Sequence, residues 1–118
     1  MTDVAYKLVD GGEWAEARTA GAYGGSAVDR ADGYIHMSTA DQLAETARRH
    51  YRGRGDLVLA TVDLTGLGPS LRWEASRGGA MFPHLYGDLP MTAVQEDRPL
   101  DVDDEGLMRF SDGDVAWS

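Results

Sequence analysis

Apolar and polar residues alternate at the start of the chain, and the spacing then changes to that of a helix. Residues 4–9 place every second side chain on the same face, which is the period of a β-strand. Asp10 and Glu13 follow with the spacing of a capping box, an arrangement that begins many helices. The sequence therefore predicts a strand over 4–9 and a helix over 11–20, with Trp14 facing the core.

The same periods and the turn residues predict the rest of the chain. Residues 22–33 are rich in Gly and Asp and indicate a loop, and Thr39 with Gln42 has capping-box spacing. Further elements are expected as a strand over 34–37, a helix over 40–51, and strands over 56–64, 71–74 and 91–95, the last extending as far as 98. Because about two helices are too few for parallel crossovers, we expect an α+β fold with a mainly antiparallel or mixed sheet.

Composition and charge indicate how many domains the chain forms and which classes of partner it binds. A chain of 118 residues predicts one domain, over 1–110, followed by a flexible tail at 111–118. The formal net charge of -9 repels phosphate backbones and anionic membranes, so we expect a small-molecule ligand and neither nucleic acid nor membrane as a partner. The acidic residues at 101–105 are expected to form a solvated turn.

Several kinds of chemistry and location are excluded by what the sequence lacks. The chain contains no cysteine, which removes disulfides and thiolate metal ligands. Its N-terminus has neither a basic nor an apolar signal region, and no apolar run approaches the roughly 20 residues of a spanning helix. The expected location is the cytoplasm.

A first polar cluster lies where the strand over 34–37 meets the next helix. Alternation places His36 and Ser38 on one face of the strand. Thr39 follows at the helix N-terminus, whose free N–H groups attract anions. The alternative is a core histidine bonded to the backbone, with Ser38 and Thr39 acting only as caps.

A second polar cluster is the dense and irregular segment 71–87. It is interrupted by Gly-Gly and Pro, and we interpret residues 75–87 as a loop that presents side chains. We expect this segment to meet the His36 segment in one cleft. Its candidate ligand-binding residues are Arg72, Arg77 and Tyr86, and its candidate catalytic residues are Glu74 and His84.

A metal site is an alternative interpretation of these residues. His36, His84 and Glu74 have the composition of a two-histidine, one-carboxylate triad. The sequence has no close-spaced histidine pair, however, so we expect no metal. His50 lies at a helix C-terminus, where a cation is favourable without any function.

Segments 33–39 and 71–87 together resemble the bacterial family DUF952, a domain of unknown function. Tyr6, Lys7, Leu8 and Trp14 fit the same family, and the resemblance covers about residues 4–100. It implies the fold of the ADP-ribosyltransferases, in which a split antiparallel sheet surrounds an NAD cleft.

The resemblance also implies roles for individual residues. His36 and Thr39 would hold ribose and nicotinamide, Tyr86 would stack on the nicotinamide ring, and Arg72 or Arg77 would meet the pyrophosphate. A late-strand glutamate would stabilise positive charge on the ribose carbon. Glu96 matches that role by its order along the chain, whereas Glu74 lies in the denser motif.

Three hypotheses follow for the function. The first is NAD or nucleotide binding, with cleavage of the nicotinamide–ribose bond. The second is a catalytically inactive module that binds a small anionic metabolite. The third is a metal-dependent enzyme that uses His36 and His84.

Overall fold

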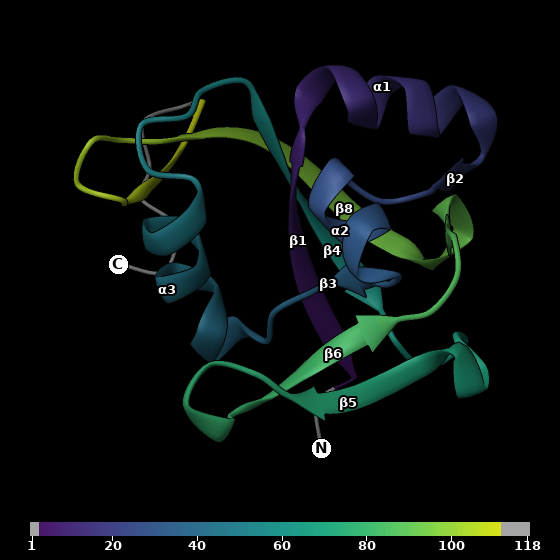
Figure 1. The fold of residues 1–118 in the computed structure, drawn as a ribbon. Coiled ribbons are helices and arrows are strands. Elements are labelled where there is room, and N and C mark those ends of the chain that lie inside the picture. The colour runs from purple at the N-terminus through teal and green to yellow at the C-terminus, as the bar shows by residue number, and fades with distance from the viewer. Residues whose placement is uncertain (1–2, 112–118) are drawn as a thin grey trace.

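The computed structural model describes residues 3–111 and has an α+β architecture with antiparallel sheets (Figure 1). The described residues form a four-stranded sheet of order β1-β4-β8-β9, a three-stranded sheet of order β3-β6-β5 and a two-stranded sheet of order β2-β7. The strands are β1 Val4–Asp10, β2 Ala22–Tyr23, β3 Ile35–His36, β4 Leu57–Asp63, β5 Leu71–Ala75, β6 Met81–Leu85, β7 Leu89–Pro90, β8 Val94–Val102 and β9 Met108–Phe110. The helices are α1 Gly11–Ala20, α2 Ala27–Asp32 and α3 Ala40–His50, with short 3-10 turns at Gly68–Ser70, Arg77–Gly79 and Met91–Ala93.

Strand β4 of the four-stranded sheet is buried on both faces, as its nearly continuous apolar sequence predicts. Leu57 and Leu59 belong to one buried cluster with Leu43 of α3. Ala60 and Val62 belong to a second buried cluster, with residues of α1 and the smaller sheets. Alternating side chains of one strand therefore help to form two cores.

Both helices expected from capping-box spacing are present. The Asp10 side chain accepts a hydrogen bond from the Glu13 N–H at 3.0 Å at the start of α1, and Gly21 ends the helix with φ 92°. The Thr39 N–H donates to Gln42 Oε1 at 3.0 Å at the start of α3. No helix within residues 3–111 combines the length and the apolar character that crossing a membrane requires.

The expected loop over 22–33 is wrong. It contains strand β2 and helix α2, so three α-helices lie within the described residues. Ser26 and Asp29 form a capping box at the start of α2, and Gly33 ends this helix with φ 91°. The many glycines and aspartates favour a loop by composition, although Ser26 and Asp29 have the capping-box spacing that predicts a helix start.

The interpretation of 75–87 as an irregular loop is also wrong in its second half. Residues 81–85 form strand β6, the central strand of the three-stranded sheet, and pair with both β3 and β5. The acidic turn begins only after Asp101 and Val102, which close strand β8. Trp117 and the rest of the expected tail, apart from Ser111, lie outside the described residues.

Candidate functional site

The three-stranded sheet brings the two polar segments of the sequence together. His36 on β3 lies directly opposite His84 on β6, and His84 lies opposite Arg72 on β5. Directly opposed residues of antiparallel strands share a face, as do residues two apart along one strand. We call this surface the polar face, and it consists of Tyr34, His36, Arg72, Glu74, His84 and Tyr86.

The aromatic rings of the polar face contact one another. The Tyr34 ring stacks on His84 with centroids 4.1 Å apart, and it lies 4.6 Å from His36 and 5.1 Å from Tyr86. The His36 and His84 rings meet edge to face at 5.5 Å. The structure therefore places His36 beside His84, as expected from the sequence, and adds Tyr34, which the sequence analysis missed.

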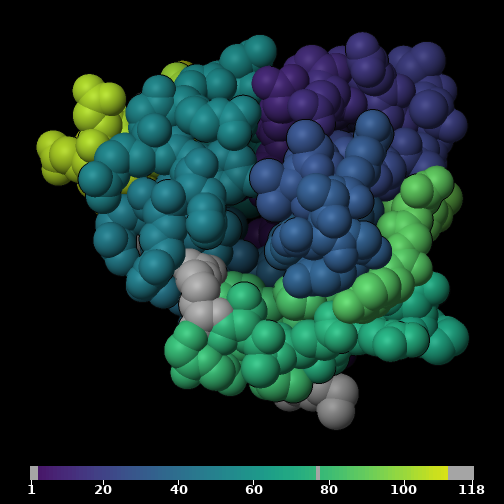
Figure 2. All heavy atoms as spheres, in the orientation of Figure 1, coloured from purple at the N-terminus to yellow at the C-terminus, as the bar shows by residue number. Residues whose placement is uncertain are grey.

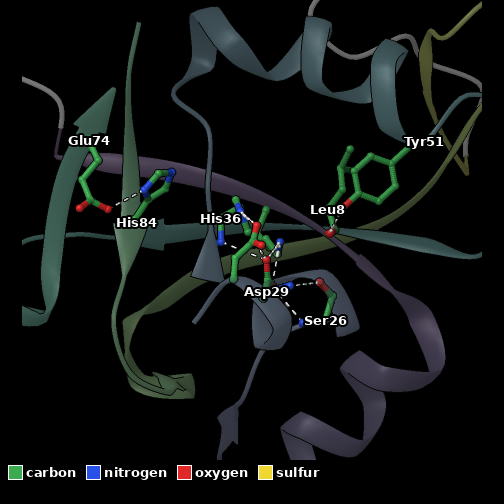
Figure 3. A network of polar contacts seen from close by, with 9 residues as sticks. Leu8, Ser26, Asp29, His36, Tyr51, Glu74 and His84 are labelled. Atoms are coloured by element: carbon green, nitrogen blue, oxygen red, sulfur yellow. Dashed lines mark hydrogen bonds and ion pairs between the residues drawn. The ribbon is translucent and has the colours of Figure 1, made fainter. Parts of the chain in front are cut away.

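Glu74 is held in place by two neighbours on the polar face. Its Oε1 lies 2.8 Å from His84 Nδ1 (Figure 3). The same oxygen accepts a hydrogen bond from the Tyr86 hydroxyl at 2.7 Å. The hydrogen bonds with His84 and then Tyr86 lower the pKa of Glu74, and the bond to Glu74 raises the pKa of Tyr86. The half-exposed carboxylate is therefore ionised, while the tyrosine keeps its proton.

A buried ion pair lies beneath His36. Asp29 of α2 is 2% exposed and Lys7 of β1 is 5% exposed, and Lys7 Nζ lies 3.0 Å from Asp29 Oδ2. Asp29 Oδ1 also lies 2.6 Å from His36 Nδ1 and accepts the His36 backbone N–H at 3.1 Å (Figure 3). On the solvent side, His36 Nε2 faces Asp32 Oδ2 at 2.9 Å. The ring orientation of His36 is therefore set by two carboxylates.

The protonation of Asp29 is governed by opposing effects. Burial alone raises the pKa of Asp29, but the hydrogen bond from His36, the charge of Lys7 and two backbone N–H donors outweigh it and hold the pKa far below its ordinary value. Burial lowers the pKa of Lys7, and the charge of Asp29 opposes this. The carboxylate and the ammonium group thus depend on each other for their charged forms.

We predict that acid weakens the fold through Asp29. Because its folded-state pKa lies below the ordinary value of 3.8, its contribution to stability is complete above that pH and is lost as the pH falls further. Denaturant titrations of wild type and Asp29→Asn at several pH values measure this contribution. The difference in unfolding free energy between the two proteins should shrink below pH 3.8, and a constant difference would contradict the assignment.

The local sequence of α2 explains why Asp29 lies beside His36 and Lys7. The Ser26 hydroxyl accepts the Asp29 N–H at 3.1 Å, and Asp29 Oδ2 accepts the Ser26 N–H at 2.9 Å. The other carboxylate oxygen, Oδ1, remains for His36, and Lys7 Nζ lies within 3.2 Å of both oxygens. The sequence analysis missed Asp29, Asp32 and Lys7. The Ser26–Asp29 capping-box spacing was the available signal for α2, whereas no local pattern marks Lys7.

Other predicted residues lie away from the polar face. The buried Ser38 hydroxyl pairs with Thr46 Oγ1 of α3 at 2.9 Å. Thr39 lines a shallow hollow of about 220 Å³ at the start of α3. Asp3 and Asp41 border the same hollow, and their carboxylates disfavour the anion expected there.

The two candidate glutamates and the two candidate arginines are separated by the structure. Glu96 is an exposed residue of β8 opposite Thr61, in a different sheet from Glu74. The Arg72 guanidinium lies 5.0 Å from the centre of the Tyr86 ring, which joins it to the polar face. The Arg77 side chain lies outside the described residues.

Within residues 3–111, no group of three or more histidine and acidic side chains is arranged to hold a metal ion. On the polar face, Nδ1 of His36 contacts the Asp29 carboxylate and Nδ1 of His84 contacts the Glu74 carboxylate. These two ring nitrogens are therefore occupied by hydrogen bonds.

Comparison with known proteins gives the family. A family model described as a protein of unknown function, DUF952, matches residues 8–97. The chain belongs to the DUF952 family. This match confirms the family resemblance of the two polar segments, and both lie within the matched range. No protein with a curated description matches the chain.

Solved structures of one protein resemble this DUF952 chain over nearly its whole length. The crystal structure of CC0527 from Caulobacter crescentus shares 46% identity and a TM-score of 0.85, covering 92% of this chain and 96% of that one. Its solution NMR structure shares 44% identity and a TM-score of 0.77, covering 98% and 93%. The two proteins therefore have the same fold.

Proposed function

We propose that the polar face binds the nicotinamide end of NAD⁺ and that the chain cleaves the nicotinamide–ribose bond, within a fold related to the ADP-ribosyltransferases. The observation that carries the proposal is the aromatic surface of Tyr34 and Tyr86, bordered by the carboxylates of Asp32 and Glu74. The proposal places the protein in the cytoplasm, a compartment that contains NAD.

The carboxylates of Glu74 on the polar face and Asp32 at its border favour a planar cation. The nicotinamide ring of NAD⁺ is a positively charged aromatic ring, and tyrosine faces attract such rings. The Tyr86 side chain is 37% exposed and carries its hydroxyl 2.7 Å from Glu74 Oε1. A ring stacked on Tyr86 would therefore lie beside an ionised carboxylate. Carboxylates on the same surface repel a small anionic metabolite, so they disfavour a ligand that consists only of such an anion.

The phosphates of NAD⁺ need a positive group at the edge of the same surface. Arg72 is exposed and lies against the Tyr86 ring, at the boundary between the aromatic rings and solvent. A guanidinium group binds phosphate oxygens through two parallel hydrogen bonds. Against a formal net charge of -9, this cation supplies local attraction for the diphosphate.

Glu74 is the carboxylate that we assign to the reaction. Cleavage of the nicotinamide–ribose bond develops positive charge on the ribose carbon, and a preoriented carboxylate stabilises that charge. Glu74 is oriented by His84 and Tyr86, whereas Glu96 lies on another sheet. We propose that His36 binds a ribose hydroxyl or the amide through Nε2 in place of Asp32, while Asp29 fixes the ring at Nδ1.

We predict that NAD⁺ raises the melting temperature of the protein and that NADH, with its neutral dihydronicotinamide ring, raises it less. At a ligand concentration of about 100 times Kd, binding adds about 2.7 kcal/mol of stability, which corresponds to a shift of many degrees for a domain of this size. Differential scanning fluorimetry measures the shift. His36→Ala and Tyr86→Leu should abolish most of it.

Leu107→Ala is the matched control, because Leu107 is exposed to a similar extent as Tyr86 but lies in the turn before β9. It should respond to NAD⁺ like wild type. Absence of a wild-type shift at saturating NAD⁺ would refute the proposal. A shift with small anions in its place would support a binding module for an anionic metabolite.

A further inference from the structure

Strand β5 forms an edge of the three-stranded sheet. The strand order is β3-β6-β5, and within residues 3–111 no strand pairs with the second edge of β5 (Figure 1). Figure 2 shows the β5–β6 hairpin at the surface, below the segment that contains α2. Unpaired N–H and C=O groups at such an edge form a template for another strand.

The hydrogen bonds at the two ends of the β5–β6 pair show which backbone groups face outward. The Tyr86 N–H donates to the Ser70 carbonyl, and the Ser76 N–H donates to the Ala80 carbonyl, both at 2.8 Å. In an antiparallel ladder, every second residue bonds to a given neighbour. The even-numbered residues of β5 therefore face β6, and Leu71, Trp73 and Ala75 direct their backbone groups to the free edge.

The side chains of β5 are complementary to a second, antiparallel copy of the same strand. A pairing centred on Trp73 places Trp73 opposite the partner's Trp73. It also places Arg72 opposite the partner's Glu74 and Glu74 opposite the partner's Arg72. Opposite charges directly across a ladder stabilise it, and facing aromatic side chains add to this. Trp73 is 38% exposed in the single chain, so pairing would bury apolar surface.

The neighbouring registers are unfavourable. A shift that keeps the outward-facing residues paired moves the centre to Arg72 or to Glu74. The register centred on Arg72 places the two Arg72 side chains directly opposite each other. The register centred on Glu74 does the same with the two Glu74 side chains. Like charges directly across a ladder destabilise it. Charge therefore selects the register centred on Trp73.

We propose that β5 pairs with β5 of a second copy of this chain and forms a symmetric dimer with a continuous six-stranded sheet. The pairing uses the same surface on both copies, so it closes after two chains. Both polar faces then lie on the same side of the sheet, and the partner's Arg72 lies beside Glu74. This assembly does not depend on any ligand.

Sedimentation velocity over a range of protein concentrations tests the proposal. Wild type should show a species of twice the 12.8 kDa chain mass that becomes more populated with concentration. Arg72→Glu or Glu74→Arg alone creates two like-charge pairs and should raise the dimer dissociation constant by about tenfold. The double variant with both changes should restore dimerisation.

Two further variants separate dimer loss from misfolding. Trp73→Pro removes an outward-facing N–H and leaves the β5–β6 hydrogen bonds, so it should give a folded monomer by circular dichroism. Arg49→Glu, on the exposed surface of α3, is the charge-reversal control and should dimerise like wild type. A wild-type monomer at every concentration would overturn the proposal. A folded double variant that stays monomeric would also overturn it.

Discussion

Replacing Asp29 with asparagine is expected to lower the free energy of unfolding by about 3–5 kcal/mol, because the change leaves the Lys7 charge buried without its partner. Lys7 Nζ lies 3.0 Å from Asp29 Oδ2, and both side chains are almost completely buried. The same carboxylate also accepts from the His36 ring and backbone, so the variant loses the group that orients His36. Urea denaturation of the wild type and the variant measures the loss.

A double-mutant cycle with Lys7→Met shows how much of this loss comes from the charge. The double variant has no unpaired buried charge, so it should be more stable than the sum of the single losses predicts. Glu45→Gln is the matched control, since its contacts with Arg48 and Arg49 are half-exposed, and it should cost only about 0–1 kcal/mol. A similarly small loss for Asp29→Asn would mean that the buried pair is not a stabilising centre of the fold.

Replacing Glu74 with glutamine is expected to slow nicotinamide release from NAD⁺ by about 100- to 1000-fold, the usual effect of removing one preoriented electrostatic group. Glutamine keeps the size of the side chain and can still accept a hydrogen bond from Tyr86, but it has no charge. The ribose carbon then develops positive charge without a neutralising partner. Chromatographic measurement of nicotinamide over time, with saturating NAD⁺, follows the reaction.

The chain contains a control for this experiment in Glu96. It is an exposed glutamate on β8, in the other large sheet, and Glu96→Gln should release nicotinamide at the wild-type rate. Tyr86→Phe keeps the aromatic ring but removes the hydroxyl that bonds Glu74, so it should give an intermediate rate. Loss of activity in Glu96→Gln with retention in Glu74→Gln would transfer the catalytic role to Glu96. A wild-type protein that binds NAD⁺ but releases no nicotinamide would be a binder without turnover.

Local patterns predicted most long elements of this fold, but the strand expected over 91–98 is wrong in its bounds, because Met91–Ala93 form a 3-10 turn and β8 covers Val94–Val102. Strand β1 and helix α3 have strong periodicity, and helices α1 and α3 begin with capping residues, so neighbouring positions carry the information that forms these elements. The same signals predicted β4 as a strand buried on both faces. Helix α2 has only six residues, and its capping box was hidden among glycines and aspartates.

The candidate site was predicted in part. The two polar segments were expected to meet, and His36 lies opposite His84. The alternation rule, applied to Tyr34 and His36, would have added Tyr34. The sequence does not decide between Glu74 and Glu96, because chain order favours Glu96 and motif density favours Glu74. The structure separates them by placing Glu74 in contact with His84.

The sequence by itself determined the family, the α+β class and the two polar segments, because these depend on residue types and short-range spacing. Only the tertiary structure decided that His36 faces His84 across β3 and β6, since the register of two distant strands depends on packing and not on local pattern. It also decided that Lys7, on an ordinary-looking strand, is buried against Asp29. Burial of a charge is favourable only when a partner from elsewhere in the chain arrives at the same place, and that is a property of the folded chain.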